Sequence, residues 1–319
     1  MAEVLRNDFD IEEISASRML LSEFFDNFNS EHTKQAYRRD ISGILDFAAR
    51  SFSINSPTDI KRFHVIQYKE YLLKDCAPKT VNRKLSSVSS FLSFLVEKGL
   101  MESNPCTNIR RPRQSVKRET EGLSDEEVGL ILTKGLDKAS GSYHLHRAIL
   151  VMFFATGIRR SELIGIKRSD YKKIKEGASL SILAKGGKFL TKLIPPQCVV
   201  VIDDYLDHMA SIDRVITGDQ YLFQPSKNPI GDNNKKMSTT SVRYIISKAC
   251  KRAGISKRIS AHSARASYIS AALEGGADML HVSQDVGHSS VQTTEIYNKR
   301  RLSIENSPSL KIKYLNSEE

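Results

Sequence analysis

The chain has 319 residues, with 48 lysines and arginines against 37 aspartates and glutamates, and a formal net charge of +11. Apolar residues make up 40% and charged residues 27%, which is typical of folded chains and argues against long disorder. The length favours two domains. Because the sequence has no long apolar run and starts with an acidic segment, we expect neither a membrane span nor a secretory signal.

The charge is unevenly distributed along the chain. Residues 1–31 contain 2 basic and 8 acidic residues, whereas residues 105–120 contain 5 basic residues and 1 acidic residue. An acidic arm, which we place at residues 1–16, followed by a basic body indicates a polyanionic partner such as nucleic acid. A basic surface that is merely solvated would give the same composition, so charge alone leaves both interpretations open.

The four cysteines are far apart in the sequence, at Cys76, Cys106, Cys198 and Cys250. No CxxC pair is present to hold zinc, and a disulfide framework is not expected in a chain of this size without an export signal. We therefore expect reduced thiols in a cytosolic protein, and no metal site.

Residues 17–104 are predicted to form a small domain of four or five helices. Apolar side chains recur at helical spacing through 17–28, 32–50 and 81–97, and Pro57 separates two of the predicted elements. The basic side chains lie largely outside the apolar stripes. They are Lys34, Arg38, Lys79, Arg83 and Lys84.

Residues 105–120 have little apolar content, two prolines and several cations, which is typical of a linker. Its first arginines are Arg110, Arg111 and Arg113. These charges suit a phosphate backbone, although they would also keep a linker soluble.

A second domain is predicted over residues 121–301. Ser124 and Glu127 form a capping box at its first helix, and an almost continuous apolar helix follows. Two alternating stretches, 179–184 and 189–194, flank a Lys-Gly-Gly-Lys turn and predict a hairpin. The remaining elements read as helices, so the fold class is mostly α with a small antiparallel sheet (α+β). The tail, 302–319, has apolar residues that suit docking on a neighbouring protomer, or it is a frayed end.

Two short stretches of the second domain combine glycine with cations. Gly157 ends the apolar helix, Arg159 begins the next helix, and Glu162 follows three positions later. A guanidinium at a helix start is suited to an anion, although a simple ion pair explains the pattern as well. Lys185 lies in the hairpin turn, where an exposed lysine is the ordinary alternative.

Two further stretches lie near the carboxyl end. His262 and Arg265 are three positions apart and share one helical face, a poor arrangement for a metal but a good one for phosphate. Gly287 and His288 precede Tyr297 by about one short helix. Taken singly, a surface pair and a core tyrosine are the ordinary explanations.

The order of these residues is more specific than any single stretch, and it resembles the tyrosine recombinase (phage integrase) family, in particular Xer/integrase-like recombinases. Thr156–Leu163 resembles the family's first arginine box, and His262–Tyr297 resembles its second box. The resemblance covers residues 30–300 and implies a SAM-like N-terminal core-binding domain followed by a catalytic domain. Ala264, Ala266 and Val286 depart from the usual residues, which bears on the subfamily rather than on activity.

The resemblance implies a role for each residue of the two boxes. Tyr297 would attack the scissile phosphate and leave a 3′-phosphotyrosyl link. Arg159 and Arg265 would hold the non-bridging oxygens and neutralise the charge that grows in the transition state, with a further hydrogen bond from His288.

The proton transfers and the supporting contacts are implied in the same way. His262 is the candidate base for the tyrosine proton, and Lys185 would protonate the departing 5′-oxygen, with Lys188 as a weaker candidate. Glu162 would orient its neighbours. No metal, cofactor or ATP is expected, since the cations take the place of a divalent ion and the phosphotyrosine retains the energy needed for religation.

The implied partner is double-stranded DNA with an inverted-repeat site, bound by a homotetramer that is a monomer or weak dimer in isolation, in the bacterial cytoplasm. The cations expected on the DNA are Lys34, Arg38, Lys79, Arg83, Lys84, Arg110, Arg111 and Arg113. Two alternatives remain: a type IB topoisomerase-like or hairpin-telomere enzyme, and a catalytically inactive DNA-binding relative.

Overall fold

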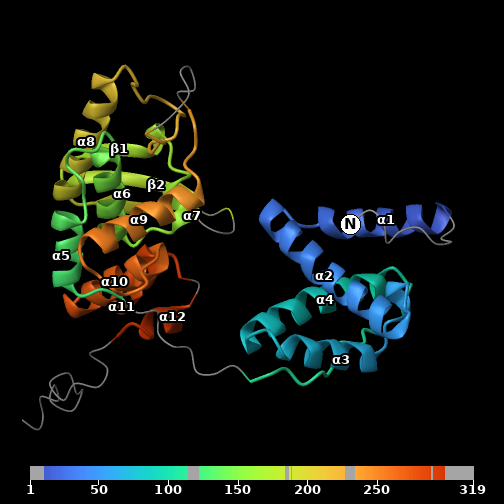
Figure 1. Ribbon diagram of the computed structural model, residues 1–319. Coiled ribbons are helices and arrows are strands. Elements are labelled where there is room, and N and C mark those ends of the chain that lie inside the picture. Colours follow the sequence, from blue (N-terminus) through green and yellow to red (C-terminus); the bar gives the residue numbers. More distant parts are fainter. Residues whose placement is uncertain are drawn as a thin grey trace, which may run out of the picture. The chain divides into compact units, whose positions relative to one another are not determined.

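The computed structural model describes residues 11–113, 122–183, 187, 189–226, 234–288 and 290–298. The chain forms two compact units, an N-terminal helical unit and a larger C-terminal unit, and each has its own hydrophobic core. Figure 1 shows the elements of both units.

Residues 11–113 of the N-terminal unit form four α-helices and one short 3₁₀ helix. In chain order they are α1 Ile11–Asp26, α2 Glu31–Phe52, η1 Pro57–Asp59, α3 Arg62–Leu73 and α4 Pro78–Glu97. Helices α2, α3 and α4 pack against one another, and Ser30 caps α2 by accepting a hydrogen bond from the Thr33 backbone. Val81, Leu85 and Val88 are buried on one face of α4, as the helical periodicity predicts.

The described part of the predicted linker contributes to this N-terminal core. Cys106 and Ile109 are buried in the same apolar cluster as the helices. Arg62 on α3 donates to the backbone carbonyls of Thr107 and Asn108, at 3.3 and 3.1 Å. These contacts hold residues 106–109 on the helical unit.

The C-terminal unit has a three-stranded antiparallel sheet and eight α-helices among its described residues. The elements are α5 Asp125–Lys134, α6 Tyr143–Thr156, α7 Arg160–Leu163, η2 Arg168–Asp170, β1 Tyr171–Ile174, β2 Gly177–Leu183, β3 Phe189–Ile194, α8 Pro196–Ser211, α9 Thr239–Arg252, α10 Ala261–Glu274, α11 Met279–Asp285 and α12 Val291–Glu295. The Ser124–Glu127 capping box at α5 and the β2–β3 hairpin confirm two local predictions, while β1 is a strand that the sequence patterns did not reveal.

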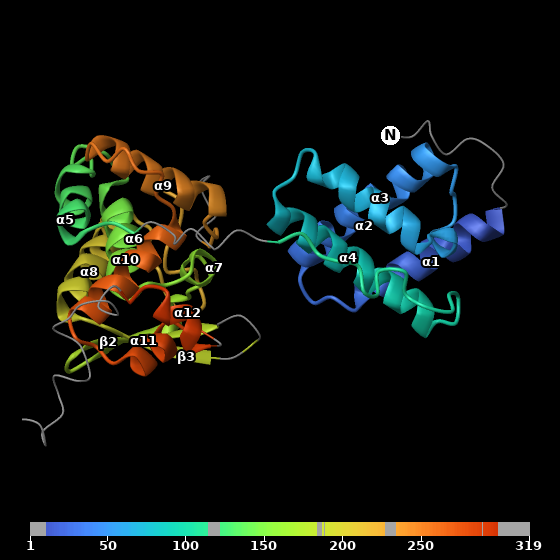
Figure 2. The same ribbon diagram turned by 90° about the horizontal axis from the view of Figure 1, so that it is seen from below.

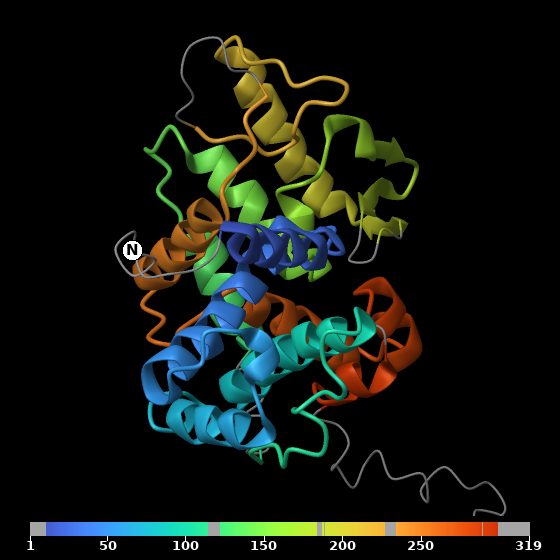
Figure 3. The same ribbon diagram turned by 90° about the vertical axis from the view of Figure 1, so that its right-hand side faces the viewer.

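The largely buried helix α6 lies at the centre of the C-terminal unit and contacts α8, α9, α10 and β3. Figure 2 shows α10 beside α6 and α11 near β3, and Figure 3 shows α8 running beside the sheet. The sheet runs in the order β1-β2-β3, with Leu183 paired to Phe189 where the hairpin closes. This arrangement brings the end of α6, the start of α10, and the segment after α11 together.

In the described part of the chain, no helix combines the length and the apolar character that a bilayer crossing requires. Likewise, no three histidine, cysteine, aspartate or glutamate side chains gather there in a way that would hold a metal ion.

Candidate active site

The first arginine of the site follows a sharp turn at the end of α6. Gly157 has a positive φ of 56°, which L side chains rarely adopt, and a Cβ there would lie 2.4 Å from the Tyr268 ring. The turn makes Arg159 the residue that precedes α7. Glu162 accepts a hydrogen bond from the Arg159 backbone at 2.9 Å, so the carboxylate fixes the start of this short helix.

Both terminal nitrogens of the Arg159 guanidinium donate hydrogen bonds. Its Nη1 donates to Glu162 Oε1 at 2.8 Å, and its Nη2 donates to the carbonyl oxygen of Gly287 at 2.7 Å. The Glu162 side chain is buried, whereas the Arg159 side chain is 31% exposed. The guanidinium is therefore oriented by groups from two distant parts of the chain and still reaches solvent.

The second arginine, Arg265 on α10, is 3% exposed. It donates to the carbonyl oxygen of Gly157 at 2.8 Å and to the carbonyl oxygen of Val286. Burial and the nearby charge of Arg159 lower the pKa of Arg265 to about 10. This group stays protonated at neutral pH, because even the lowered value lies well above 7.

The two arginines line one cavity. It has a volume of about 290 Å³ and is bordered by Arg159, Arg160, Ser260, Ala261, His262 and Arg265. His262 is exposed in the first turn of α10, one turn before Arg265. The structure thus brings together three of the residues that the sequence motifs single out, although more than a hundred residues separate Arg159 from Arg265.

His288 lies beside the same cationic groups. Its Nδ1 is 2.8 Å from the hydroxyl of the buried Thr294, which orients the ring. Burial, followed by the positive charges of Arg265 and Arg159, lowers the pKa of His288 to about 4. The ring is therefore neutral at physiological pH in the DNA-free protein.

Tyr297 follows α12 directly, and its backbone donates to the Thr294 carbonyl at 3.0 Å. The half-buried side chain packs on a small apolar cluster formed by α10 and α11, and its ionised form would raise the pKa of Arg265. The phenol is thus within electrostatic range of the buried arginine.

Two predicted residues fall outside the described residues, namely Lys185 and its weaker alternative Lys188. In the sequence they lie between β2 and β3, whose pairing is described as far as Leu183 and Phe189.

The cations predicted to contact DNA in the N-terminal unit differ in their surroundings. Lys34 pairs with Asp26 at 3.3 Å, and Arg38 pairs with Glu31 at 3.5 Å. Lys79 is exposed in the first turn of α4.

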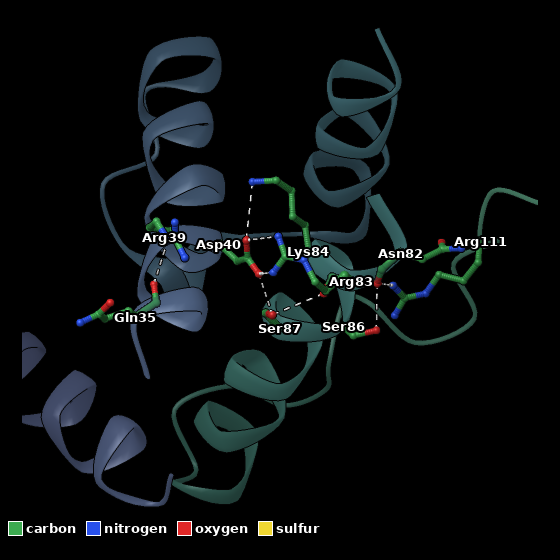
Figure 4. Close-up of polar contacts among 9 residues, drawn as sticks. All are labelled: Gln35, Arg39, Asp40, Asn82, Arg83, Lys84, Ser86, Ser87 and Arg111. Carbon is green, nitrogen blue, oxygen red and sulfur yellow. Dashed lines mark hydrogen bonds and ion pairs between the residues drawn. The ribbon is translucent and has the colours of Figure 1, made fainter. Parts of the chain in front are cut away.

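Two more of these cations converge on the buried Asp40. Arg83 donates to both carboxylate oxygens, with the Nη2–Oδ1 bond at 3.0 Å, and Lys84 Nζ is 3.6 Å from Oδ1. The Ser87 hydroxyl donates to Oδ2 at 2.9 Å. Figure 4 shows this cluster joining α2 to α4.

The arginines at the beginning of the predicted linker are exposed. Arg111 donates to the Asn82 carbonyl at 3.1 Å, which Figure 4 also shows. Arg110 and Arg113 are exposed on either side of it.

Several polar groups around the site were not predicted from the sequence. They are the three carbonyls that hold the arginines, the hydroxyl of Thr294, and a hydrogen-bonded trio formed by the buried Lys192 with Asp285 and Tyr268. The strand alternation could have revealed Lys192, because it shares a face of β3 with Leu190 and Ile194. The three backbone carbonyls had no such signal, because a sequence motif does not reveal which carbonyls accept hydrogen bonds.

Comparison with known proteins decides the family. The Phage integrase family model matches residues 123–302, and the Phage integrase N-terminal SAM-like domain model matches residues 23–99. The chain belongs to the phage integrase family, and it is a tyrosine recombinase. The sequence-based assignments of family, fold class and enzyme class are therefore confirmed.

Among curated proteins, the chain is 28% identical over 271 residues to tyrosine recombinase XerC of Thermodesulfovibrio yellowstonii, covering 84% of this chain and 86% of that protein. It is 27% identical to tyrosine recombinase XerD of Halalkalibacterium halodurans, covering 84% and 87%.

A solved structure of the XerH site-specific recombinase bound to palindromic difH substrate, in a post-cleavage complex, is similar to this chain with a TM-score of 0.69. It is 17% identical, and the match covers 85% of this chain and 78% of that one. A lambda integrase dimer (residues 75–356) bound to a core site has a TM-score of 0.63 at 17% identity, covering 86% and 96%. These likenesses agree with the fold described above.

Proposed function

We propose that the protein is a site-specific recombinase that breaks and rejoins duplex DNA through a 3′-phosphotyrosyl intermediate. The observation that carries the proposal is the cavity where Arg159 and Arg265 meet beside His262. Two guanidinium groups at one cavity suit a single phosphodiester, since each presents a planar set of donors. Tyr297, within charge range of Arg265, is the nucleophile of this proposal.

In the cleavage step, the Tyr297 oxygen attacks phosphorus as the bond from phosphorus to the 5′-oxygen breaks. The phenol proton leaves for a base, for which His262 is our candidate, and the departing 5′-oxygen takes a proton from Lys185. A free tyrosine has a pKa of about 10, so deprotonation at neutral pH costs about 4 kcal/mol. Nearby guanidinium charge offsets this cost and stabilises the phosphorane-like transition state.

The reverse step uses the same groups in opposite roles. A 5′-hydroxyl attacks the phosphotyrosine, the phenol leaves, and a phosphodiester forms again. One phosphate ester replaces another in each direction, so no ATP is consumed. The arginines carry the charge that a divalent ion would otherwise supply, and we therefore propose that strand cleavage proceeds without a metal.

We propose that the exposed cations of the N-terminal unit and of the predicted linker, among them Lys79, Arg110 and Arg113, contact DNA phosphates. Support comes from related folds solved on DNA, including a lambda integrase tetramer bound to a Holliday junction. By this analogy, four copies of the chain assemble on paired sites. The bacterial XerC and XerD relatives suggest action in the bacterial cytoplasm.

The test is the capture of a covalent adduct. The protein is incubated with long randomised duplexes that have first been enriched for non-covalent binding, in the presence of EDTA, and denatured in detergent. We expect a DNA adduct on Tyr297 in the wild type and none in Tyr297→Phe, which retains binding. Tyr244→Phe, which alters a tyrosine 60% exposed on α9, is the matched control and should form adducts normally.

The outcomes separate the alternatives. Adducts that need magnesium would contradict the metal-free mechanism, and adducts in Tyr297→Phe would reassign the nucleophile. Wild-type protein that binds DNA without any adduct would indicate an inactive relative. Relaxation of supercoiled DNA without recombinant products, on plasmids carrying the captured site, would favour a topoisomerase.

A further inference from the structure

A lysine is buried in the sheet next to the candidate active site. Lys192 lies on β3 at an inward-facing position, and its side chain is only 1% exposed. Its Nζ donates to Asp285 Oδ2 at 2.7 Å. Burying an ammonium group is costly unless a carboxylate compensates it, so the pair compensates a buried lysine, although the Asp285 side chain itself is 32% exposed.

The Asp285 carboxylate binds a second donor. The Tyr268 hydroxyl donates to the same Oδ2 at 2.9 Å, and Lys192 Nζ lies 5.6 Å from the centre of the Tyr268 ring. Lys192 belongs to β3, Tyr268 to α10, and Asp285 is the last residue of α11. One carboxylate therefore ties a strand and two helices together.

The residues that follow Asp285 are the ones that hold the two arginines. The carbonyl of Val286 accepts a hydrogen bond from Arg265, and the carbonyl of Gly287 accepts one from Arg159. Moving Asp285 would therefore move both acceptors, since they lie one and two residues away along the backbone.

The remaining acceptor is linked to the same cluster through Tyr268. A Cβ at Gly157 would lie 2.4 Å from Cδ1 of the Tyr268 ring, so the ring is seated directly against this glycine. The Gly157 carbonyl is the second acceptor of Arg265. All three carbonyls that orient the arginines are thus adjacent, through the chain or through packing, to the trio of Lys192, Asp285 and Tyr268.

We propose that Lys192, Asp285 and Tyr268 are positioning residues that hold the carbonyls of Gly157, Val286 and Gly287 in register, and thereby aim Arg159 and Arg265 at the scissile phosphate. This inference rests on the recombinase function proposed above. Its physical basis is that misplacement of a charge-stabilising group by about 1 Å can cost about a hundredfold in rate. An ion pair placed only for stability would show no such link to the chemistry.

The test replaces the ion pair by apolar residues of similar size, in the double variant Lys192→Met with Asp285→Leu. Such replacements often preserve stability. The double variant therefore remains informative even if the single variant Asp285→Asn, which leaves the buried lysine without a carboxylate partner, fails to fold. We expect normal DNA affinity but adduct formation slowed about tenfold to a hundredfold, measured on the captured duplex in single turnover. Tyr268→Phe, which keeps the ring but loses the hydroxyl, should give a smaller loss of about threefold.

The matched control is the ion pair between Arg147 and Asp204, which has the same 2.7 Å distance but joins α6 to α8. Arg147→Met with Asp204→Leu should leave the cleavage rate unchanged. The proposal is overturned if this control variant slows cleavage as much as the Lys192 and Asp285 double variant does, for the same loss of melting temperature. The trio would then have a merely structural role. Wild-type cleavage by the Lys192 and Asp285 double variant would overturn it as well.

A second measurement needs no DNA, so its outcome is independent of the proposed function. The backbone amides of Gly287 and His288 donate to Gln284 and Ser283, both at 2.9 Å, and report on this segment. Their hydrogen exchange should be about tenfold faster in the double variant than in the wild type, with the amides of α8 unaffected. Unchanged exchange at both amides would contradict the positioning role even if the protein proved to be no recombinase.

Discussion

Two arginines, one in each unit, show two ways of holding a guanidinium. Arg83 in the N-terminal unit donates to the carboxylate of the buried Asp40, which carries the opposite charge. Arg265 in the C-terminal unit donates to two backbone carbonyls, which are polar but uncharged. The first arrangement joins two helices and cancels charge, whereas the second fixes the geometry and leaves the charge in place.

This difference explains why only one of the two arginines is suited to chemistry on a phosphate. A neutral carbonyl orients a guanidinium without neutralising it, so the positive field remains available to an anion. The lowered pKa of Arg265, about 10, reflects first its burial and then the positive charge of the neighbouring Arg159, which together outweigh the opposing effect of Glu162. We infer that Arg83 has a structural role alongside any DNA contact that it makes.

The variant Arg265→Lys tests most directly whether the two arginines differ in function. An ammonium group cannot donate to both carbonyls and to a phosphate in one plane, so we expect adduct formation to fall about 10²–10³-fold. DNA affinity should change little, because the helical unit and the linker supply most of the phosphate contacts in our proposal. The measurement is single-turnover cleavage at saturating protein, and equal losses of rate and affinity would mean that Arg265 is an ordinary backbone contact.

The opposite result is expected for the charge-cancelling pair. Asp40→Asn should destabilise the N-terminal unit by about 2 kcal/mol, because hydrogen bonds to a charged acceptor are replaced by weaker ones. The cleavage rate of bound DNA should stay unchanged. Urea unfolding measures the first effect, with Asp26→Asn as control, since its pair with Lys34 is exposed and is worth about 0.5 kcal/mol. A slowed cleavage step in Asp40→Asn would erase the distinction between the two arginines.

A smaller effect is expected where the backbone itself supports Arg159. Gly287 has a φ of 63°, and a Cβ there would lie 3.4 Å from Arg159 Nη1. Gly287→Ala should cost about 1 kcal/mol of backbone strain and slow cleavage about tenfold. Gly254→Ala provides the control, because Gly254 has a φ of 75° and open space around its Cβ position. It should show the loss of stability without the loss of rate.

The last prediction leaves the catalytic rate aside and concerns the pH dependence of stability at His288, whose pKa is lowered to about 4 by burial and by the two arginines. The unfolded chain binds a proton there near pH 6.5, whereas the folded protein excludes it until the pH approaches 4. The stabilising contribution is therefore present above pH 6.5 and is lost as the pH falls toward 4. Urea unfolding of the DNA-free protein should show this dependence, and His288→Gln should flatten it. An imidazole titration midpoint near 6.5 for His288 would contradict the prediction.

The local elements followed from the sequence because their causes are local. Helical periodicity, the Ser124–Glu127 capping box and the glycine turn between β2 and β3 act within a few residues, so the helices and the hairpin were predictable. Strand β1 was missed because its four residues, Tyr171–Ile174, have one buried and three exposed side chains. That pattern is too short and too polar to indicate a strand on its own.

The candidate site was predictable only as a set of side chains. Arg159, His262 and Arg265 could be singled out by residue type and order, and the structure places them around one cavity. Their hydrogen-bond acceptors could not be predicted, since any residue type supplies a backbone carbonyl. The burial of Lys192 had a signal in the strand alternation of β3, but its partner Asp285 could not be predicted, because it lies far away in the sequence.

The sequence by itself determined which groups the protein carries and where the chain bends to present them: two guanidinium groups, two imidazoles and a phenol, separated by helices and glycine turns. Only the tertiary structure decided that Arg265 rests on uncharged carbonyls while Arg83 rests on a carboxylate. The reason is physical. Side-chain chemistry is written into each residue, but the electrostatic environment of a charge depends on which distant backbone and side-chain atoms the fold packs against it.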